Sequence, residues 1–425
     1  MKNLKVFFPL NVAVAGFGLL SFLLLLPPCV SAKPSVDAVV TNDSSQRGPT
    51  KEEMKNSKPF VNPAPAPDTS AVQPLGGDFP VELPEAAPEA MELQGSANVQ
   101  AYGEFGVPYT SKRVTHDSLP ADVKVSENSL AYLSATFPYR TIGRLNFKDD
   151  DGDWTHCSAS LILRSVIVTA AHCIQVNGKG SSTYSNWTFV PAYFQRNTPD
   201  SKVVAPYGSW VWKAYVRPTS WADGTDTSVG SAYNNDLAVI LLGKDTDGQF
   251  IGDKTGWLRY GQTDGYFVKS KRTGNLWTAA LTTLGYPGKS DNGAIQQRCD
   301  GPSYKTSIDS VLQIYQGSDF TGGSSGGPWI ANFGYQEPVF SEGAGPGQKS
   351  LSNVVVGVTS WGDGEPGPQY DNYSSRFGKN EEYPDNSYGT FGAGNIAALL
   401  DALCSKKPPR SDQTYQELGY CDNKK

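Results

Sequence analysis

The hydrophobic residues of this chain fall into short runs that are separated by clusters of turn-forming residues. Such runs are typical of buried β-strands when Gly, Pro, Asn and Asp bound them on both sides. The clearest runs are at 160–163, 166–169, 237–242 and 354–358. The pattern therefore predicts an all-β protein built from short strands.

One helix is well patterned, over residues 393–404. Four apolar residues there follow the i, i+3, i+4, i+7 spacing that places side chains on one helical face: Ile396, Leu399, Leu400 and Leu403. Residues 406–425 are polar and charged. We expect them to form a polar tail outside the hydrophobic core.

The segment before the first strand-like run has the composition of unfolded sequence. Residues 33–113 are rich in Pro, Ala, Ser, Asp and Glu. Such a segment buries too little apolar surface to offset the entropy of chain ordering, and we expect a disordered propeptide or spacer. The dibasic pair Lys112-Arg113 at its end is a candidate cleavage site, because linkers are where proteolysis concentrates. The alternative for this pair is a solvated basic surface.

Residues 1–32 have the pattern of a signal peptide. Lys2 and Lys5 precede a long apolar run, and small residues suit cleavage after Ala32. We therefore expect a secreted protein, extracellular or periplasmic, without stable membrane association once the signal is removed. An uncleaved membrane anchor is the alternative, since the apolar run is long for a signal.

Composition narrows the classes of function. The chain has 425 residues, of which 38% are hydrophobic and 18% charged, and its net charge is -6 at pH 7. This balance excludes a basic nucleic-acid-binding protein and a polytopic membrane protein. The sequence contains only three histidines. A histidine-built metal centre is therefore not expected, and we predict no metal and no cofactor.

Three short motifs carry the candidate chemistry. His172 lies in Thr-Ala-Ala-His-Cys, Asp236 in Asn-Asn-Asp-Leu-Ala-Val, and Ser325 in Gly-Gly-Ser-Ser-Gly-Gly-Pro. Each motif alone is more often structural, as a core histidine, a turn aspartate or a flexible loop. Their occurrence together, each beside a strand-like run, is very hard to obtain by chance.

With these motifs, the sequence resembles the trypsin/chymotrypsin-like serine peptidases over about 137–404. Phe137-Pro138-Tyr139-Arg140 and Gly285-Tyr286-Pro287-Gly288 resemble the secreted microbial branch that contains the glutamyl endopeptidases. The resemblance implies a peptidase domain over 114–405 with two antiparallel six-stranded β-barrels, at about 133–245 and 250–392, and the C-terminal helix.

The resemblance also implies a role for each motif residue. His172 is the acid/base, Asp236 orients the imidazole, and Ser325 is the nucleophile. The amides of Gly323 and Ser325 would form the oxyanion hole. Ser324 takes the variable position of the family pattern Gly-x-Ser-Gly-Gly-Pro, where trypsin-like zymogens keep an Asp. The trypsin-type activation switch is therefore expected to be absent.

Substrate preference is predicted less directly. Asp319 takes the family's pocket-floor position, where a carboxylate would pair with Arg or Lys. Glutamyl-specific members usually have a His at the position of Thr359, and its absence counts against Glu specificity. Ser360, Trp361 and Gly362 resemble the segment that lines the pocket and pairs with substrate. The alternatives are Glu or broad specificity, or a non-catalytic binding protein on the peptidase fold.

Export to an oxidising compartment predicts disulfides. Signal cleavage leaves five cysteines, and this odd count leaves one without an intramolecular partner. The positions of Cys157 and Cys173 match the family disulfide that holds the His-bearing loop. Cys299, Cys404 and Cys421 have no assigned partners. We expect a monomer that acts on polypeptide substrates.

Overall fold

The computed structural model describes residues 39–42, 46–61, 110–114, 133–195, 203–226, 233–269, 277–305, 313–334, 351–362 and 371–423. The predicted signal peptide (1–32) and much of the predicted spacer lie outside these residues. None of the helices within the described ranges has the length and apolar character needed to span a bilayer.

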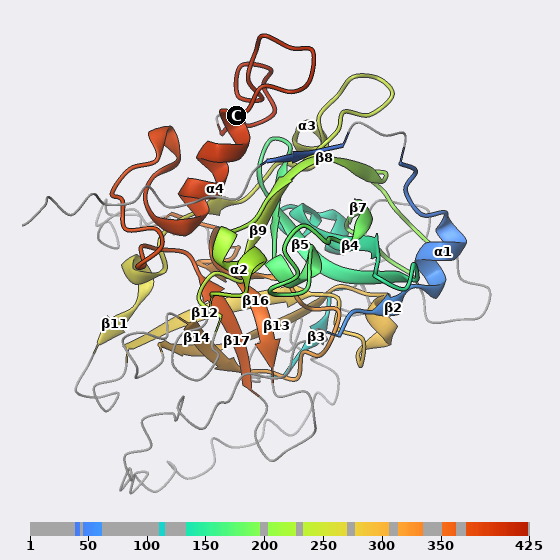
Figure 1. Cartoon of the computed structure of the whole chain (residues 1–425). Coiled ribbons are helices and arrows are strands. Elements are labelled where there is room, and N and C mark those ends of the chain that lie inside the picture. Colours follow the sequence, from blue (N-terminus) through green and yellow to red (C-terminus); the bar gives the residue numbers. More distant parts are fainter. Residues whose placement is uncertain are drawn as a thin grey trace, which may run out of the picture. The chain divides into compact units, whose positions relative to one another are not determined.

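The first barrel is formed by six antiparallel strands, drawn in green shades in Figure 1. Their hydrogen-bonded order is β4-β5-β6-β9-β8-β7, and β7 pairs again with β4 to close the barrel. The strands are β4 (Ile142–Lys148), β5 (Trp154–Leu163), β6 (Val166–Thr169), β7 (Ser185–Pro191), β8 (Trp210–Val216) and β9 (Ala238–Leu242).

The second barrel repeats this design with strands drawn from yellow to red. Its order is β12-β13-β14-β17-β16-β15, closed by the pairing of β15 with β12. The strands are β12 (Trp277–Gly285), β13 (Gln297–Lys305), β14 (Gln313–Gly317), β15 (Pro328–Ala331), β16 (Val354–Gly362) and β17 (Asp371–Arg376). The predicted all-β fold of two six-stranded barrels is confirmed.

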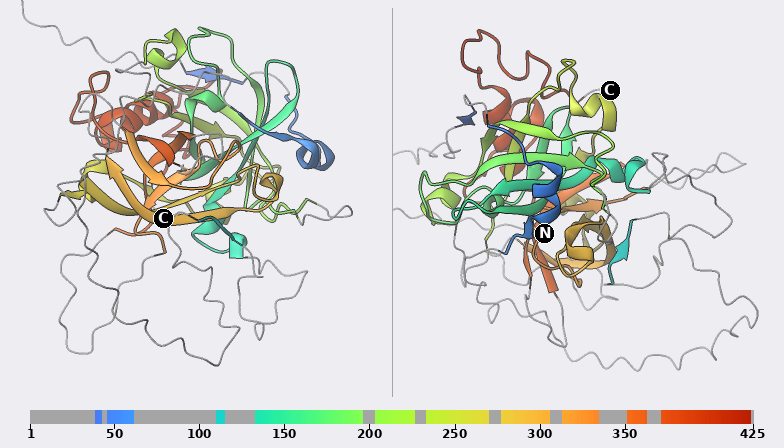
Figure 2. Two further views of the ribbon diagram at one scale, coloured as in Figure 1. Left: turned by 90° about the horizontal axis from the view of Figure 1, so that it is seen from below. Right: turned by 90° about the vertical axis from the view of Figure 1, so that its right-hand side faces the viewer.

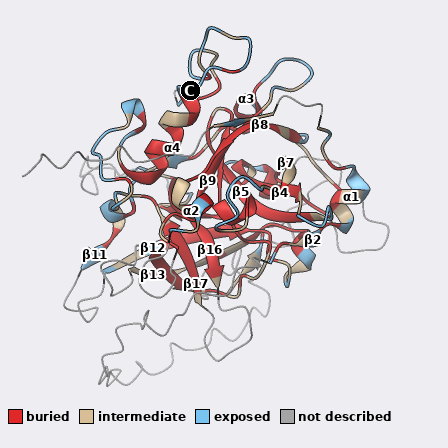
Figure 3. Ribbon diagram, viewed as in Figure 1, coloured by how far each residue is buried: buried red, intermediate tan, exposed pale blue. Residues whose placement is uncertain are grey.

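Burial explains why the predicted strands were visible in the sequence. Figure 3 shows the barrel strands almost entirely buried. All five residues of β9 are buried, because it lies between β6 and β8. The start of β16 follows Asn353, whose φ of 56° is in the left-handed region that Asn tolerates and that ends a turn. Continuous apolar runs between turn residues therefore correspond to barrel strands.

The chain beyond the second barrel returns to the first. Helix α4 (Gly394–Cys404) contacts β8 and β9 through its buried apolar face. The following residues were expected to form a polar tail, but they fold back. Tyr415 is fully buried, and the Ser165 amide donates to the carbonyl of Tyr420 at 2.9 Å. A disulfide joins Cys404 to Cys421. Buried Tyr415 and Tyr420, together with this disulfide, attach the C-terminal residues to the fold, which their polar composition did not indicate.

The segment 33–113 also differs from the prediction where it is described. It contains β1 (Val40–Thr41) on β8, helix α1 (Lys51–Asn56), β2 (Lys58–Pro59) on β5, and β3 (Lys112–Arg113) on β13. The right-hand view of Figure 2 shows the blue segment with α1 along the green strands. Isolated from the barrels this segment lacks a core of its own. It is ordered because Met54 and Phe60 pack into the hydrophobic clusters of the barrels.

The dibasic pair is part of this ordered structure. Lys112 and Arg113 pair with β13, the Arg113 guanidinium donates to the Asp291 carboxylate, and the next residue, Val114, is buried. The pair is therefore held in a sheet rather than in an open linker. Cleavage at this site would require β3 to leave β13 first.

The Cys404–Cys421 bond is expected to contribute measurably to stability. The two residues are 17 positions apart, and closing a loop of that size typically stabilises a fold by about 3 kcal/mol. Replacing both residues by Ser should lower the free energy of unfolding by about that amount in urea denaturation. Ser405→Ala, at an exposed neighbouring position, is the control. An unchanged midpoint in the double variant would show that packing of Tyr415 and Tyr420 alone holds the tail.

Candidate active site

The described residues bring His172 and Asp236 into direct contact. His172 lies in the short 3-10 helix Ala171–Cys173 after β6, and Asp236 precedes β9. Because β6 pairs with β9, the two motifs leave the same edge of the first barrel. His172 Nδ1 donates to Asp236 Oδ2 at 2.7 Å, and the His172 amide donates to Oδ1 at 2.9 Å. Both side chains are fully buried.

The second barrel completes the surroundings of this carboxylate. The Ser360 hydroxyl, from β16, donates to Asp236 Oδ2 at 2.6 Å. The Asp236 amide donates to the Ser375 hydroxyl, from β17, at 3.1 Å. Ser360 is also one of the residues predicted to bind substrate, and its side chain points at Asp236. The carboxylate is thus held by donors from both barrels.

The contact with Asp236 determines which nitrogen of His172 can act as a base. Since Nδ1 faces a carboxylate, it carries the proton, which leaves the lone pair on Nε2. Nε2 is buried and makes no hydrogen bond to any residue that the structure describes. The site therefore presents an unpartnered acceptor nitrogen.

Ser325 lies in a turn whose shape depends on two glycines. Gly323 and Gly326 have φ of 93° and 78°, a region that favours glycine. A Cβ on Gly323 would lie 2.6 Å from the carbonyl oxygen of Tyr286. The Gly326 amide donates to Thr359 O, and Ser325 O accepts from the Ser158 amide, each at 2.8 Å. These bonds tie the turn to both barrels.

The two serines of this turn differ in their described contacts and in their exposure. The Ser324 hydroxyl donates to the Thr321 carbonyl at 2.7 Å, within its own turn. Ser324 is 3% exposed and Ser325 is 9% exposed. The hydroxyl of Ser324 is therefore committed to a backbone bond, which agrees with the family pattern that makes Ser325 the reactive serine.

The candidate pocket residues are distributed around β16. Thr359 is buried, and its hydroxyl accepts from Trp329 Nε1 at 3.0 Å. The ring of Trp361 stacks on Tyr373 with centroids 3.8 Å apart. A Cβ on Gly362 would lie 2.9 Å from Asn372 Nδ2. The Asp319 carboxylate accepts from the amide and hydroxyl of Ser111, each at 3.0 Å.

Cys157 and Cys173 form a disulfide beside this site. The sulfur atoms and a nitrogen of His172 lie within 4.8 Å of one another, a grouping that would suit a metal if the thiols were free. Their disulfide bond removes both thiolates. Among the described cysteines, Cys299 is unpaired and buried, and burial raises the pKa of its thiol to about 12.

A polar network that the sequence did not reveal supports the Asp236 segment. The Asp226 carboxylate accepts from the amides of Asn234 and Asn235, at 3.1 and 2.7 Å. Burial, opposed by the hydrogen bond from the Asn235 amide and aided by the charge of nearby Glu382, raises the pKa of Asp226 to about 7. Glu382 itself accepts from Asn235 Nδ2 at 2.8 Å. No short motif marks Asp226, because its hydrogen-bond donors, the amides of Asn234 and Asn235, come eight and nine residues later in the chain.

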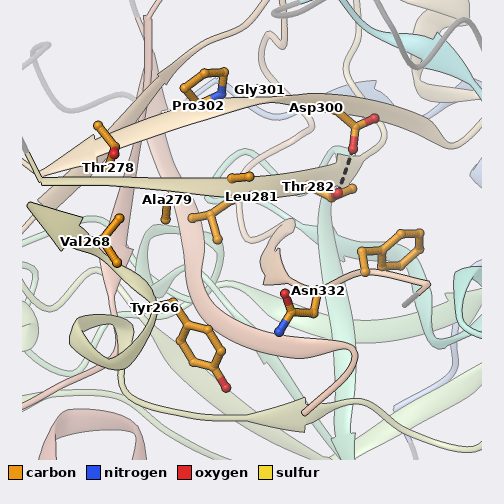
Figure 4. Close-up of a pocket in the computed structure, with 12 residues that line it drawn as sticks. Tyr266, Val268, Thr278, Ala279, Leu281, Thr282, Asp300, Gly301, Pro302 and Asn332 are labelled. Carbon is orange, nitrogen blue, oxygen red and sulfur yellow. Dashed lines mark hydrogen bonds between the residues drawn. The ribbon is translucent and has the colours of Figure 1, made fainter. Parts of the chain in front are cut away.

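A groove lies on the second barrel, where β12 pairs with β13. Its volume is about 560 Å³, and its lining includes Tyr266, Leu281, Pro302 and Asn332. Figure 4 shows the Asp300 carboxylate at its rim, where it accepts from the Thr282 hydroxyl. None of the three motif residues lines this groove, so it is separate from the candidate site.

Comparison with known proteins identifies the family. The family model described as Trypsin matches residues 137–378, which is more than half of the chain. The chain belongs to the trypsin family. All three motif residues lie within the matched part of this trypsin-family chain.

Three solved protease structures are similar to part of this trypsin-family chain. The protease Anisep from Arthrobacter nicotinovorans is 24% identical, with a TM-score of 0.41 over 56% of this chain and 90% of its own. A thermostable serine protease, AL20, from an extremophilic microorganism is 20% identical, with a TM-score of 0.41 over 56% of this chain and 91% of its own. A Glu endopeptidase is 20% identical, with a TM-score of 0.38 over 57% and 88%. No curated protein sequence matches this chain.

The raised pKa of Asp226 predicts a pH-dependent stability. The unfolded carboxyl has a pKa near 3.8 and the folded one about 7, so between these values the folded state binds the extra proton. Stability from this group is therefore present at low pH and is lost as the pH rises toward 7. From pH 5 to pH 8, Asp226→Asn should gain roughly 2–3 kcal/mol relative to the wild type in urea denaturation.

The control for this experiment is Asp223→Asn, since Asp223 is exposed in the nearby helix α2 (Thr219–Asp223). The control variant should follow the wild-type pH profile. Parallel profiles of Asp226→Asn and the wild type would show that Asp226 does not take up a proton on folding.

Proposed function

We propose that His172, Asp236 and Ser325 are the catalytic triad of this serine endopeptidase, and that the enzyme is secreted. The observation that carries the proposal is the buried His172–Asp236 contact of 2.7 Å, which leaves Nε2 unpartnered within the described residues. The turn that carries Ser325 is hydrogen-bonded to both barrels, as the Asp236 carboxylate is. The predicted signal peptide supports the proposal of secretion.

The proposed reaction is acyl transfer to serine and then to water. His172 Nε2 takes the proton of the Ser325 hydroxyl as its oxygen attacks the scissile carbonyl. Asp236 stabilises the imidazolium that forms. The same Nε2 gives the proton to the leaving amine, and an acyl-enzyme remains on Ser325. Water, activated by His172, then releases the second product.

The tetrahedral intermediates need donors for their negative oxygen. We assign this role to the amides of Gly323 and Ser325, as the family resemblance implies, and the Ser324 amide between them donates within the turn to the Thr321 carbonyl at 3.1 Å. One such donor is typically worth about 3–4 kcal/mol in the transition state. The tight fit of Gly323 against the Tyr286 carbonyl would hold its amide in a fixed direction.

The assignment of the nucleophile is testable by two single substitutions. Ser325→Ala should lower turnover of a peptide substrate by about a million-fold, as nucleophile loss does in such triads. Ser324→Ala should keep most of the activity, because its hydroxyl serves only a bond within its turn. Covalent labelling by an organophosphonate, located by mass spectrometry, checks the same point. The reverse pattern in the two variants would refute the assignment, and absence of labelling would favour a non-catalytic binding protein.

For substrate preference we propose Arg or Lys before the scissile bond, recognised by the Asp319 carboxylate. Ser111 supplies two hydrogen bonds to this group. A carboxylate has about four lone-pair positions, so capacity for a guanidinium remains. The buried hydroxyl of Thr359, in place of an imidazole, supports the choice against Glu.

Cleavage of a peptide library, analysed by mass spectrometry, tests this preference. The wild type should cut mainly after Arg and Lys, and Asp319→Ser should lose that preference while still cutting after other residues. The Asp247→Ser variant, at an exposed position after β9, should keep the wild-type pattern. Cleavage mainly after Glu, or a pattern unaltered by Asp319→Ser, would refute the proposal.

A further inference from the structure

Part of the N-terminal segment lies on the proposed catalytic residues. We define residues 46–61 as the plug segment. The Gly323 amide, assigned above to the oxyanion hole, donates to the carbonyl oxygen of Phe60 at 3.0 Å. A donor that already holds this carbonyl is not free for the oxygen of a substrate. One half of the proposed oxyanion hole is therefore filled from within the chain.

The side chain of Phe60 covers the catalytic histidine. Its ring stacks on the imidazole of His172, with centroids 5.9 Å apart and planes inclined by 16°. The same ring packs against Phe147 and Tyr184, at 5.3 and 5.4 Å between centroids. Phe60 is 6% exposed, although Val61 beside it is 74% exposed. The plug segment thus buries one large side chain at the proposed catalytic base, and the next residue, Val61, is exposed to solvent.

The backbone of the plug segment is bound as an added strand. β2 runs parallel to β5, with Lys58 opposite Thr155 and Pro59 opposite His156. The Phe60 amide donates to the His156 carbonyl at 2.9 Å. Two glycines give room for this path. A Cβ on Gly322 would lie 2.8 Å from the Phe60 carbonyl oxygen, and one on Gly288 would collide with the Pro59 ring.

A buried cation anchors the segment before it reaches the site. Arg144 is 1% exposed, and its guanidinium donates to the carbonyls of Met54, Ser57 and Gly293 at 3.1–3.2 Å. Two of these three acceptors belong to the plug segment. Burial lowers the pKa of Arg144, because withdrawal from water disfavours the charged form. A guanidinium buried in this way depends on the carbonyls that the segment brings.

The other end of the segment has its own attachments. The Gln46 side-chain oxygen accepts from the Asn186 amide at 3.2 Å and from Trp212 Nε1 at 3.0 Å. Helix α1 between the two ends begins with a capping box formed by Thr50 and Glu53. The segment is therefore held on the barrels by contacts at both of its ends.

We propose that the plug segment is an intramolecular inhibitor of the peptidase. It occupies the Gly323 amide and the face of His172, so substrate and segment cannot bind together. This inference rests on the proposed catalytic roles of His172, Ser325 and Gly323. It predicts that the chain becomes active when Phe60 leaves its site, and that no rearrangement of the barrels is needed.

The first test compares the full chain with Phe60→Ala, which keeps the backbone but removes the buried ring. Burial of such a side chain is typically worth about a ten- to hundredfold change in an equilibrium. Labelling of Ser325 by an organophosphonate, and hydrolysis of a peptide library, should accelerate by that factor. Glu52→Ala is the matched control, because Glu52 lies in the same segment and is exposed. Its described side-chain hydrogen bond is with Asn56, inside helix α1. The control should keep wild-type rates.

The outcomes separate this inference from the proposed function. Equal and measurable rates in the wild type and Phe60→Ala would overturn the inhibitor and leave the peptidase standing. No labelling and no hydrolysis in either chain would overturn the peptidase, and the inhibitor with it. Intact-mass analysis follows the segment itself. Spontaneous cleavage of the wild type after Phe60 would identify the segment as a substrate and refute inhibition.

A second measurement supplies the segment in trans. In Phe60→Asp, a carboxylate replaces a ring among aromatic neighbours, which should release the segment. A synthetic peptide of residues 46–61 should then inhibit this variant, and the same peptide carrying Phe60→Ala should be about ten- to hundredfold weaker. A peptide carrying Glu52→Ala should match the wild-type peptide. Equal potency of all three peptides, or no inhibition by any, would overturn the proposal.

Discussion

The buried carboxylate of Asp236 is the point on which the arrangement of this molecule depends. A carboxylate that is withdrawn from water carries a large desolvation cost, which only well-placed donors offset. Here the donors are the amide and imidazole of His172, from the first barrel, and the hydroxyl of Ser360, from the second. The carboxylate is satisfied only when both barrels are folded and joined. Joining of the two barrels therefore also fixes the orientation of the His172 imidazole, the proposed catalytic base.

The sequence predicted those parts of the structure that follow from local pattern. Strands such as β9 were visible because burial on both sides demands a continuous apolar run, and the motif residues stand at the ends of such runs. Helix α4 was visible through its 3.6-residue period, and the structure begins it at Gly394, one residue after the predicted start. The contact of Ser360 with Asp236 could not be predicted, since a β-strand sequence does not indicate which face meets Asp236.

The parts that were missed are those that gain order from another part of the chain. The plug segment and the C-terminal residues have polar composition, and neither contains a hydrophobic core. Met54, Phe60 and Tyr415 each insert one side chain into a cluster built by the barrels. A single buried residue in a polar stretch leaves no periodic signal. Asp226 was missed because the amides that bind its carboxylate lie eight and nine residues further along the chain, outside any short motif.

The plug segment also changes the meaning of the Ser324 substitution in the family pattern. In trypsin-like zymogens, the Asp at that position pairs with the N-terminal amine that cleavage creates. This pairing orders the turn that carries the proposed nucleophile, so the site is incomplete before cleavage. In this chain the Ser324 hydroxyl already closes its turn on Thr321, and the Ser325 carbonyl is already bonded to Ser158. A turn that is complete in the uncleaved chain needs a different restraint. A segment that fills the Gly323 amide and covers His172 is such a restraint, and it acts by occupancy rather than by disorder. The buried guanidinium of Arg144 explains why it stays in place, because two of the three carbonyls that solvate this cation leave whenever the segment does.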